Sequence, residues 1–287
     1  MSTEYWEIPE HIDVGSFDFD WLPDLYDPPY IHQWGTVNDS LCGPRFIDDQ
    51  AIEIKYHITD TTKWLPLDIV FVSNGETGEQ RRYDRLRQVA GRTVEWVRGI
   101  NGRENALRRA AELSSTEWFF CFPGKLYAYS QFDFDFQPNR SDGLKHYIFY
   151  AENPLNGLVY GHQAAVCYNR QLILDTIDYG LDFTMSKPHD IVPIISGVAE
   201  YNSDAIMTWR TAFREAIKLS IDGSEESKDR LNTWRTFARG PHAEWSLIGA
   251  EDGVRYAESV KNLPSELMKS FEWSWLNQLF EGKYGKR

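Results

Sequence analysis

Residues suited to bind a phosphate-bearing ligand follow three short apolar runs of the sequence: Ser73, Asn74, Glu76, Gly102, Arg103, Asn105 and Lys125. Lysine and arginine compensate the charge of a diphosphate, lysine as a point charge and arginine through a fork of donors. Asn and Gly directly after the first run let the backbone turn there. These residues can act together only if the apolar runs are neighbouring strands that end at one edge of a sheet.

The elements that must position these residues alternate between strand and helix. Apolar runs at 67–72 and 118–122 are typical of strands covered on both faces, and 93–97 is a third short strand. Apolar residues recur at helical spacing in 79–90 and 103–114. This order predicts an α/β unit with a parallel sheet. Because such sheets bind ligands at the carboxyl ends of their strands, the segments after the three runs should converge there.

The 287-residue chain has a net charge of −13, which argues against a general attraction to nucleic acid or to an anionic membrane. Residues 81–109 nevertheless contain nine arginines against three carboxylates, a local balance of +6. Solvated helix faces explain such an excess. It would also suit a diphosphate or a polynucleotide backbone beside the site.

The three cysteines show no metal-ligand spacing, and Cys121 and Cys167 lie in apolar runs typical of reduced core residues. The sequence has no signal-peptide pattern and no apolar stretch near the roughly 20 residues of a membrane span. We therefore expect a cytoplasmic protein without a membrane partner.

We divide the chain into three parts. Residues 1–65, rich in Asp, Pro, Trp and Tyr, are expected to pack on the core as strand and turn segments. Residues 66–203 form the α/β core, and residues 204–287 are helical in pattern. Asp204 is suited to cap the first of these helices.

An aromatic and acidic phrase occurs twice, at 17–23 and at 132–138, each time before an apolar segment, at 29–34 and at 146–150. Alternating Phe and Asp with a period of two predicts a strand with one apolar and one acidic face. We interpret each copy as a strand and turn leading into a second strand. Edge hairpins that cover the sheet and acidic binding sites both fit the pattern.

The order of Gly102, Asn105, the small residues 110–111, the serines 114–115 and the apolar run 118–120 is distinctive. It resembles the glycine–x–x–Asn helix and following strand of GT-A-type, family-2-like glycosyltransferases. A strand-end acidic residue, here at position 76, helps hold the donor nucleotide in that plan. The resemblance implies a GT-A-like, Rossmann-type central sheet flanked by helices, with a C-terminal helical region. It also implies that the residues after the three strands bind the donor.

More closely, the sequence is similar to a bacteriophage-encoded, glycosyltransferase-like group. The similarity lies in the two aromatic and acidic phrases and in the segments 145–149, 160–162 and 208–215. It implies transfer of a sugar from a nucleotide-sugar, with a UDP-sugar as the expected donor, in the host cytoplasm. A hydroxymethylated pyrimidine in phage DNA is one acceptor consistent with this similarity, and that base would have to leave the stack.

One departure from the family pattern concerns metal binding. GT-A enzymes usually end the third strand in Asp-x-Asp, which binds a divalent cation bridging the donor diphosphate. Here that position reads Pro123-Gly124-Lys125, so the usual form of metal binding is not supported and metal dependence stays open. Lys125 could neutralise the diphosphate in place of the ion. Alternatively, the chain is a degenerate transferase that serves as a nucleotide-binding or virion-associated interaction module.

An inverting transfer needs a carboxylate base to accept the proton of the acceptor hydroxyl. Asp182 and Asp190 follow the third strand and are the candidates. His189, beside Asp190 on a Pro-flanked turn, is a candidate metal ligand, although a lone histidine is more often a satisfied structural residue.

Two further residues are candidates for the acceptor side of the site. His162 follows a glycine after Tyr160, and it either lines an acceptor pocket or makes a hydrogen bond at a strand end. Arg210 shares a helix face with Arg214 and either reaches a phosphate or pairs with a nearby carboxylate such as Glu215.

Overall fold

The computed structural model describes residues 66–176, 184, 187–260 and 263–285, and two short strands nearer the amino terminus. These strands, β1 (Ser40–Cys42) and β2 (Lys55–His57), pair antiparallel. The chain forms two compact units, 1–65 and 66–287. The first copy of the aromatic and acidic phrase and Asp182 lie outside the described residues.

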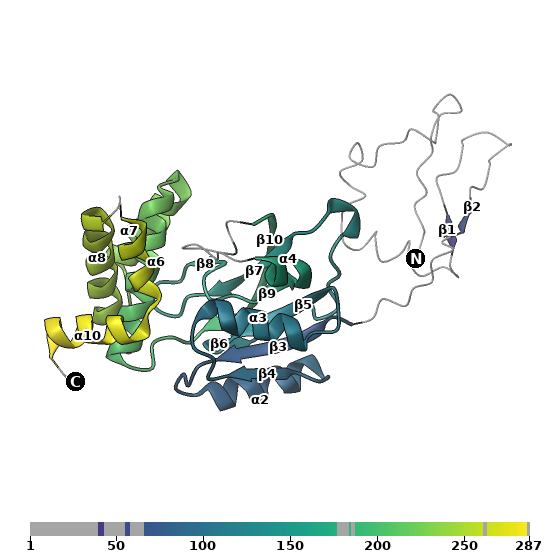
Figure 1. Cartoon of the computed structure of the whole chain (residues 1–287), viewed down its shortest axis with the longest axis horizontal. Coiled ribbons are helices and arrows are strands. Elements are labelled where there is room, and N and C mark those ends of the chain that lie inside the picture. The colour runs from purple at the N-terminus through teal and green to yellow at the C-terminus, as the bar shows by residue number, and fades with distance from the viewer. Residues whose placement is uncertain are drawn as a thin grey trace, which may run out of the picture. The chain divides into compact units, whose positions relative to one another are not determined.

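The second unit is built on a mixed sheet with the strand order β4-β3-β5-β9-β7-β10-β6, in which β8 pairs with β7 (Figure 1). Its strands are β3 (Asp68–Ser73), β4 (Glu95–Arg98), β5 (Trp118–Pro123), β6 (Leu126–Ala128), β7 (His146–Glu152), β8 (Val159–Tyr160), β9 (Val166–Asn169) and β10 (His189–Ala199). Only Gly124 and Lys125 separate β5 from β6, yet β6 pairs with β10 at the far end of the order, so the sheet is curled.

The prediction of a parallel sheet is only partly right. β3 is parallel to β4 and β5, and β7 is parallel to β10. β9 runs antiparallel between β5 and β7, and β6 runs antiparallel to β10. A short, fully apolar run shows that a strand is covered on both faces but carries no information on its direction. A Rossmann-type GT-A sheet therefore stays a prediction, and the fold established here is α/β with a mixed sheet.

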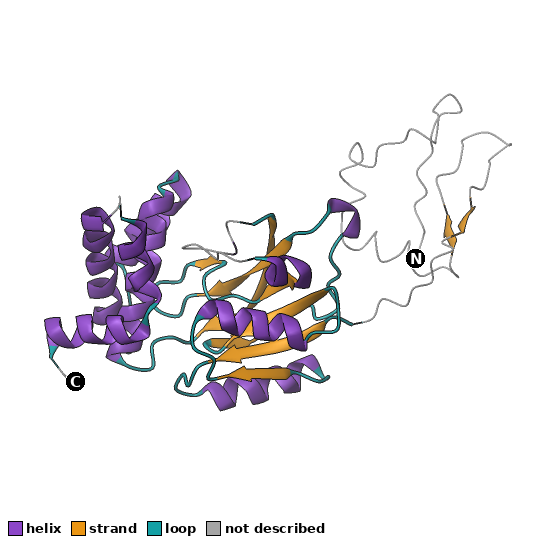
Figure 2. Cartoon of the chain, viewed as in Figure 1, coloured by secondary structure: helices purple, strands orange, loops and turns teal. Residues whose placement is uncertain are grey.

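Helices cover both faces of this sheet, as the sequence predicts (Figure 2). Leu86 of α2 (Glu79–Ala90) packs in the same cluster as Phe71 of β3. Ala110 of α3 (Arg103–Leu113) packs in a second cluster with Val70. Successive residues of a strand point to opposite faces, so α2 and α3 lie on opposite sides of β3. A shorter helix, α4 (Arg170–Asp175), follows β9 directly.

The second copy of the aromatic and acidic phrase is not a strand, contrary to the prediction. Phe132 and Phe134 are buried and the aspartates beside them are exposed, so the alternation of faces is as expected. The backbone forms turns, with the Asp135 amide donating to Asp133 Oδ1 at 3.0 Å. Such side-chain hydrogen bonds compete with strand pairing. Phe132 packs edge-on against Phe120 at 5.6 Å, and this burial satisfies the pattern without a ladder.

The C-terminal part is helical and packs on the sheet as part of the same unit. Its elements are α6 (Ala205–Asp222), α7 (Glu225–Thr236), α8 (Ala243–Val260), α9 (Pro264–Met268), the 3-10 helix η5 (Lys269–Phe271) and α10 (Trp273–Tyr284). Asp204 caps α6 as predicted, because its Oδ1 accepts from the Met207 amide at 2.7 Å. Among the described residues, no helix combines the length and the apolarity needed to cross a membrane.

Two glycines set the close approach of α6 and α8. A Cβ atom at Gly249 would lie 2.5 Å from the backbone oxygen of Trp209, and one at Gly253 would meet the backbone oxygen of Phe213. Any larger residue would therefore push the two helices apart. This packing holds α6 in a defined position, and α6 carries Arg210 and Arg214 of the candidate site.

Candidate anion-binding site

The polar residues singled out by the sequence gather at one edge of the sheet. β3, β4 and β5 are parallel, and at their carboxyl ends Ser73 pairs with Arg98 and Val72 pairs with Pro123. Glu76 follows the first of these ends and Lys125 the third. The C-terminal helices lie on this side of the sheet (Figure 1) and contribute the remaining residues.

Glu76 lies across the backbone that follows β5. Its Oε2 accepts from the Asn74 amide at 2.6 Å. A Cβ atom at Gly124 would lie 2.8 Å from the same oxygen and 2.7 Å from Ser73 Cβ. Position 124 therefore accommodates only glycine while the carboxylate stays in place. Ser73 itself is buried, and its Oγ accepts from Trp96 Nε1 at 2.8 Å.

Lys125 connects the sheet edge to α6. It is 7% exposed, and its Nζ donates to Thr211 Oγ1 at 3.1 Å. Burial lowers the pKa of Lys125 to about 7, and the positive charges of Arg214 and Arg210 act in the same direction, while Glu76 opposes them. A buried lysine among like charges is costly to the fold, and such perturbed groups are concentrated at functional sites.

A second buried cation, Arg82 of α2, holds the loops around the site. Its Nε donates to the Gly124 oxygen at 2.6 Å and its Nη2 donates to the Thr77 oxygen at 2.6 Å. Its Nη1 lies 3.2 Å from Glu200 Oε2. With these partners Arg82 positions the backbone on both sides of Glu76.

Three further arginines are held against aromatic rings at the junction of α3, α6 and α10. The Arg210 guanidinium lies 4.1 Å from the centre of the Trp273 ring, and its Nη1 donates to Asn277 Oδ1 at 3.1 Å. The guanidinium carbons of Arg103 and Arg214 lie 4.7 and 4.5 Å from the centre of the same ring, that of Phe271. Such contacts fix a guanidinium group while leaving its positive charge in place.

We call Lys125, Arg103, Arg210 and Arg214 the cationic cluster. Glu76 raises the pKa of Lys125, and Asp204 and Glu76 both act on Arg210 in the same direction. The four cations of the cluster outnumber these two carboxylates. This arrangement suits an anion with more than one negative charge.

Gly102 and Asn105 shape the start of α3 beside the cluster. Gly102 has φ of 86°, in the region that favours glycine. The Asn105 Nδ2 donates to the Asn101 oxygen at 3.0 Å and so closes the turn before the helix. The exposed side chain of Asn105 therefore supports the loop, and Arg103 is the side chain of this segment that joins the cluster.

Asp190 and His189 lie at the opposite edge of the sheet from Lys125. β10 begins at His189 in register with His146 at the start of β7, and both strands run in the same direction as β5. Asp190 accepts from Lys145 Nζ at 2.9 Å. The sequence could not reveal this separation, because the direction of β10 depends on pairing between distant segments. Asp190 cannot act as a base on a donor bound beside Lys125.

No metal site emerges for His189. Its Nδ1 lies 2.7 Å from the Lys187 oxygen. Within the part of the chain that the structure describes, His, Cys, Asp and Glu residues form no group of three or more that could hold a metal ion.

His162 belongs to a buried polar network behind the cationic cluster. Tyr160 donates to Glu215 Oε1 at 2.8 Å, and the Trp234 Nε1 donates to the Tyr160 oxygen at 2.9 Å. His162 Nε2 lies 3.7 Å from Glu215 Oε2. Burial lowers the pKa of His162 to about 4, so the imidazole is neutral at pH 7. This placement favours a structural role of His162 in the buried network over contact with an acceptor.

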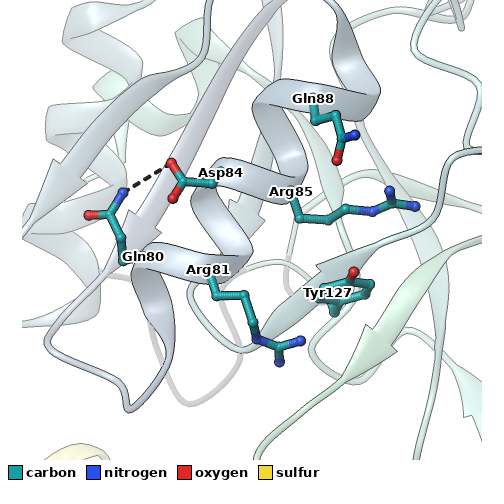
Figure 3. A pocket seen from close by; sticks show the side chains of 6 residues that line it. All are labelled: Gln80, Arg81, Asp84, Arg85, Gln88 and Tyr127. Atoms are coloured by element: carbon teal, nitrogen blue, oxygen red, sulfur yellow. Dashed lines mark hydrogen bonds between the residues drawn. The ribbon is translucent and has the colours of Figure 1, made fainter.

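The exposed face of α2 carries part of the arginine-rich segment. An open groove of about 620 Å³ runs along it, lined by Gln80, Arg81, Asp84, Arg85, Gln88 and Tyr127 (Figure 3). The guanidinium carbons of Arg81 and Arg85 lie 4.8 and 5.4 Å from the centre of the Tyr127 ring. Arg81 pairs with Glu200, and Arg85 donates to the Ala128 oxygen at 3.1 Å. These arginines tie α2 to β6.

The sequence reasoning singled out Lys125, Arg103 and Arg210 but missed the aromatic rings that hold the arginines. Phe271 and Trp273 fall in an aromatic-rich helical segment, where single rings are usually core residues. Comparisons with protein-family models, curated proteins and solved structures found no match. The geometry of this site is therefore the basis for inferring the function of the chain.

Proposed function

We propose that the chain is a nucleotide-sugar-dependent glycosyltransferase that holds the donor diphosphate with its cationic cluster. The observation that supports this most directly is the position of Lys125. It follows the third parallel strand, where GT-A enzymes usually carry metal-binding carboxylates. It is buried against Thr211, and Arg210 and Arg214 lower its pKa. Cations at this position would neutralise the charge of the diphosphate, as a divalent ion does in metal-dependent GT-A enzymes.

The chemistry of sugar transfer explains why such a cluster would be useful. As the bond between the sugar and the donor breaks, negative charge develops on the leaving diphosphate. Cations that are already fixed in place stabilise this charge without reorganisation. The ring contacts of Phe271 and Trp273 supply that fixation for the arginines. Glu76, at the end of the first strand, would accept hydrogen bonds from hydroxyl groups of the donor nucleotide, for which we propose a UDP-sugar.

The acceptor side of the proposal rests on the sequence. A hydroxyl acceptor must lose a proton, and Asp182 remains the candidate base because Asp190 lies at the other sheet edge. Hydroxymethylated pyrimidine in phage DNA is the acceptor class that the sequence similarity suggests, and the host cytoplasm is the corresponding location. The net charge of −13 leaves glycan or protein acceptors as alternatives.

A non-catalytic nucleotide-binding module is the second candidate, and one observation favours it. Glu76 is the carboxylate that acts electrostatically on Lys125, and it already accepts from the Asn74 amide. This contact holds the loop, so Glu76 is not available as a catalytic base. A chain that binds the donor but has no base would bind the donor without turnover.

The test combines binding with turnover. We expect UDP and UDP-glucose to bind in the presence of EDTA, with no gain from manganese. Lys125→Met should weaken binding about tenfold or more, the effect of losing one charge-assisted hydrogen bond of about 1.5 kcal/mol. Lys228→Met is the matched control, because that lysine is exposed and pairs with Glu225. Calorimetric titration measures both.

The outcomes separate the candidates. Binding that requires manganese would contradict a cationic cluster acting in place of a metal. Absence of binding by any nucleotide or nucleotide-sugar would contradict both candidates. Release of UDP from the donor, measured with and without hydroxymethylated DNA, supports transfer, whereas binding without release at any acceptor supports the non-catalytic module.

A further inference from the structure

Lys125 is surrounded by cations that come from separate elements. Arg82 of α2 donates to the oxygen of the preceding residue, Gly124. Arg210 and Arg214 lie on α6 beside Thr211, the hydrogen-bond partner of Lys125. All three arginines lower the pKa of Lys125. Its hydrogen-bond partner is the neutral hydroxyl group of Thr211, at 3.1 Å. Within the part of the chain that the structure describes, no carboxylate forms a hydrogen bond or an ion pair with this amine.

The groups that could offset these cations are few among the described residues. Glu76, from the segment between β3 and α2, favours the protonated amine. Glu200 pairs with Arg82, and Asp204 acts electrostatically on Arg210. His162, from the segment after β8, also feels the charge of Lys125, and it is neutral at pH 7. With the site empty, a proton on Lys125 places a positive charge at a buried position close to the guanidinium groups of Arg82, Arg210 and Arg214.

We propose that Lys125 takes up a proton when a phosphate-bearing ligand enters the cationic cluster, so that ligand binding and protonation are coupled. This inference rests on the proposed function, because it concerns the same site. A nucleotide-sugar diphosphate carries two negative charges. An opposite charge within a few ångströms favours the charged form of an amine. Binding of the diphosphate should therefore raise the pKa of Lys125.

The coupling has a consequence for the pH dependence of binding. With the site empty, burial and the neighbouring arginines lower the pKa of Lys125 to about 7. With a diphosphate bound, the pKa rises. At a pH between these two pKa values, binding of the ligand is accompanied by uptake of a proton from solution. The dissociation constant therefore increases about tenfold for each pH unit above 7. The site would therefore hold its ligand more tightly in mildly acidic solution.

The experiment is calorimetric titration of the full chain, with EDTA, in pairs of buffers that differ in ionisation enthalpy. UDP-glucose and sulfate are the probes, because neither titrates between pH 6 and 8. We expect uptake of about nine-tenths of a proton per bound UDP-glucose at pH 8 and about one-tenth at pH 6, since an amine of pKa near 7 is mostly neutral at the first pH and mostly protonated at the second.

Variants assign the proton to its residue. Lys125→Arg keeps a charge that does not titrate, and Lys125→Met removes it, so neither should take up a proton at pH 8. Lys228→Met should match the unmodified chain. If both Lys125 variants bind too weakly to titrate, the contrast between pH 6 and pH 8 in the unmodified chain decides.

Failure of the inference and failure of the proposed function differ in this experiment. Binding of UDP-glucose or sulfate with no proton uptake at pH 8 overturns the inference and leaves the proposed function standing. Uptake that persists in Lys125→Met also overturns it. If neither probe binds at pH 6 or at pH 8, the proposed anion site falls, and the coupling falls with it.

Discussion

Lys125→Met should stabilise the protein while it weakens ligand binding. Because the pKa of Lys125 is lowered from 10.5 in the unfolded chain to about 7 in the fold, the folded state holds this amine less well protonated than the unfolded state does. At pH 7 this difference corresponds to a penalty of about 4 kcal/mol. The fold tolerates the penalty, as expected where a functional group is retained at the expense of stability.

The net gain is smaller than this penalty. Methionine cannot donate to Thr211, which costs about 1 kcal/mol. The free energy of unfolding should therefore rise by about 3 kcal/mol at pH 7, which corresponds to an increase in Tm of about 9 °C. Urea unfolding followed by circular dichroism measures this in buffers free of phosphate and sulfate.

The pH dependence gives the sharper signature. Between pH 7 and 10.5 the unfolded amine is protonated and the folded amine is not, so unfolding takes up a proton and stability rises with pH. The penalty falls to about 2 kcal/mol at pH 9, where the advantage of the methionine variant should shrink to about 1 kcal/mol. Lys228→Met should show no such trend. A variant less stable than the unmodified chain at pH 7, or an advantage that stays constant to pH 9, would refute the reasoning.

Three other predictions concern neighbouring and distant residues. Gly124→Ala should destabilise the fold by about 2 kcal/mol in urea unfolding, because the added methyl group would collide with Glu76. Gly282→Ala is the control, because a methyl group there enters open space and should not destabilise the fold. Equal effects of the two substitutions would contradict the packing argument. Phe271→Leu should weaken UDP-glucose binding about fivefold in calorimetry, since the guanidinium groups of Arg103 and Arg214 lose the ring that holds them. Unchanged affinity would show that the Phe271 ring does not contribute to the site. Asp190→Asn should leave that affinity within twofold, because it lies at the other sheet edge; a tenfold loss would contradict the topology.

The local elements of the second unit follow from the sequence alone. The helices 79–90 and 103–113, the strands around 70 and 120, and the cap at Asp204 are set by apolar spacing and by a side chain that accepts from its own backbone. Lys125 and Arg103 were recognisable for the same reason. Each comes directly after a glycine, Gly124 or Gly102, in the chain segment that follows a strand, so its place at the sheet edge depends on few distant contacts.

Tertiary structure alone decided the rest. The direction of β9, the absence of a strand at 132–136 and the separation of Asp190 from Lys125 all depend on which distant segments pair. The same is true of the rings that hold the arginines and of the pKa of Lys125, which reflects burial against α6 and charges from other elements. A sequence pattern encodes which face of an element is apolar, but the partner that covers this face, and the electrostatic environment it creates, arise only when the chain packs.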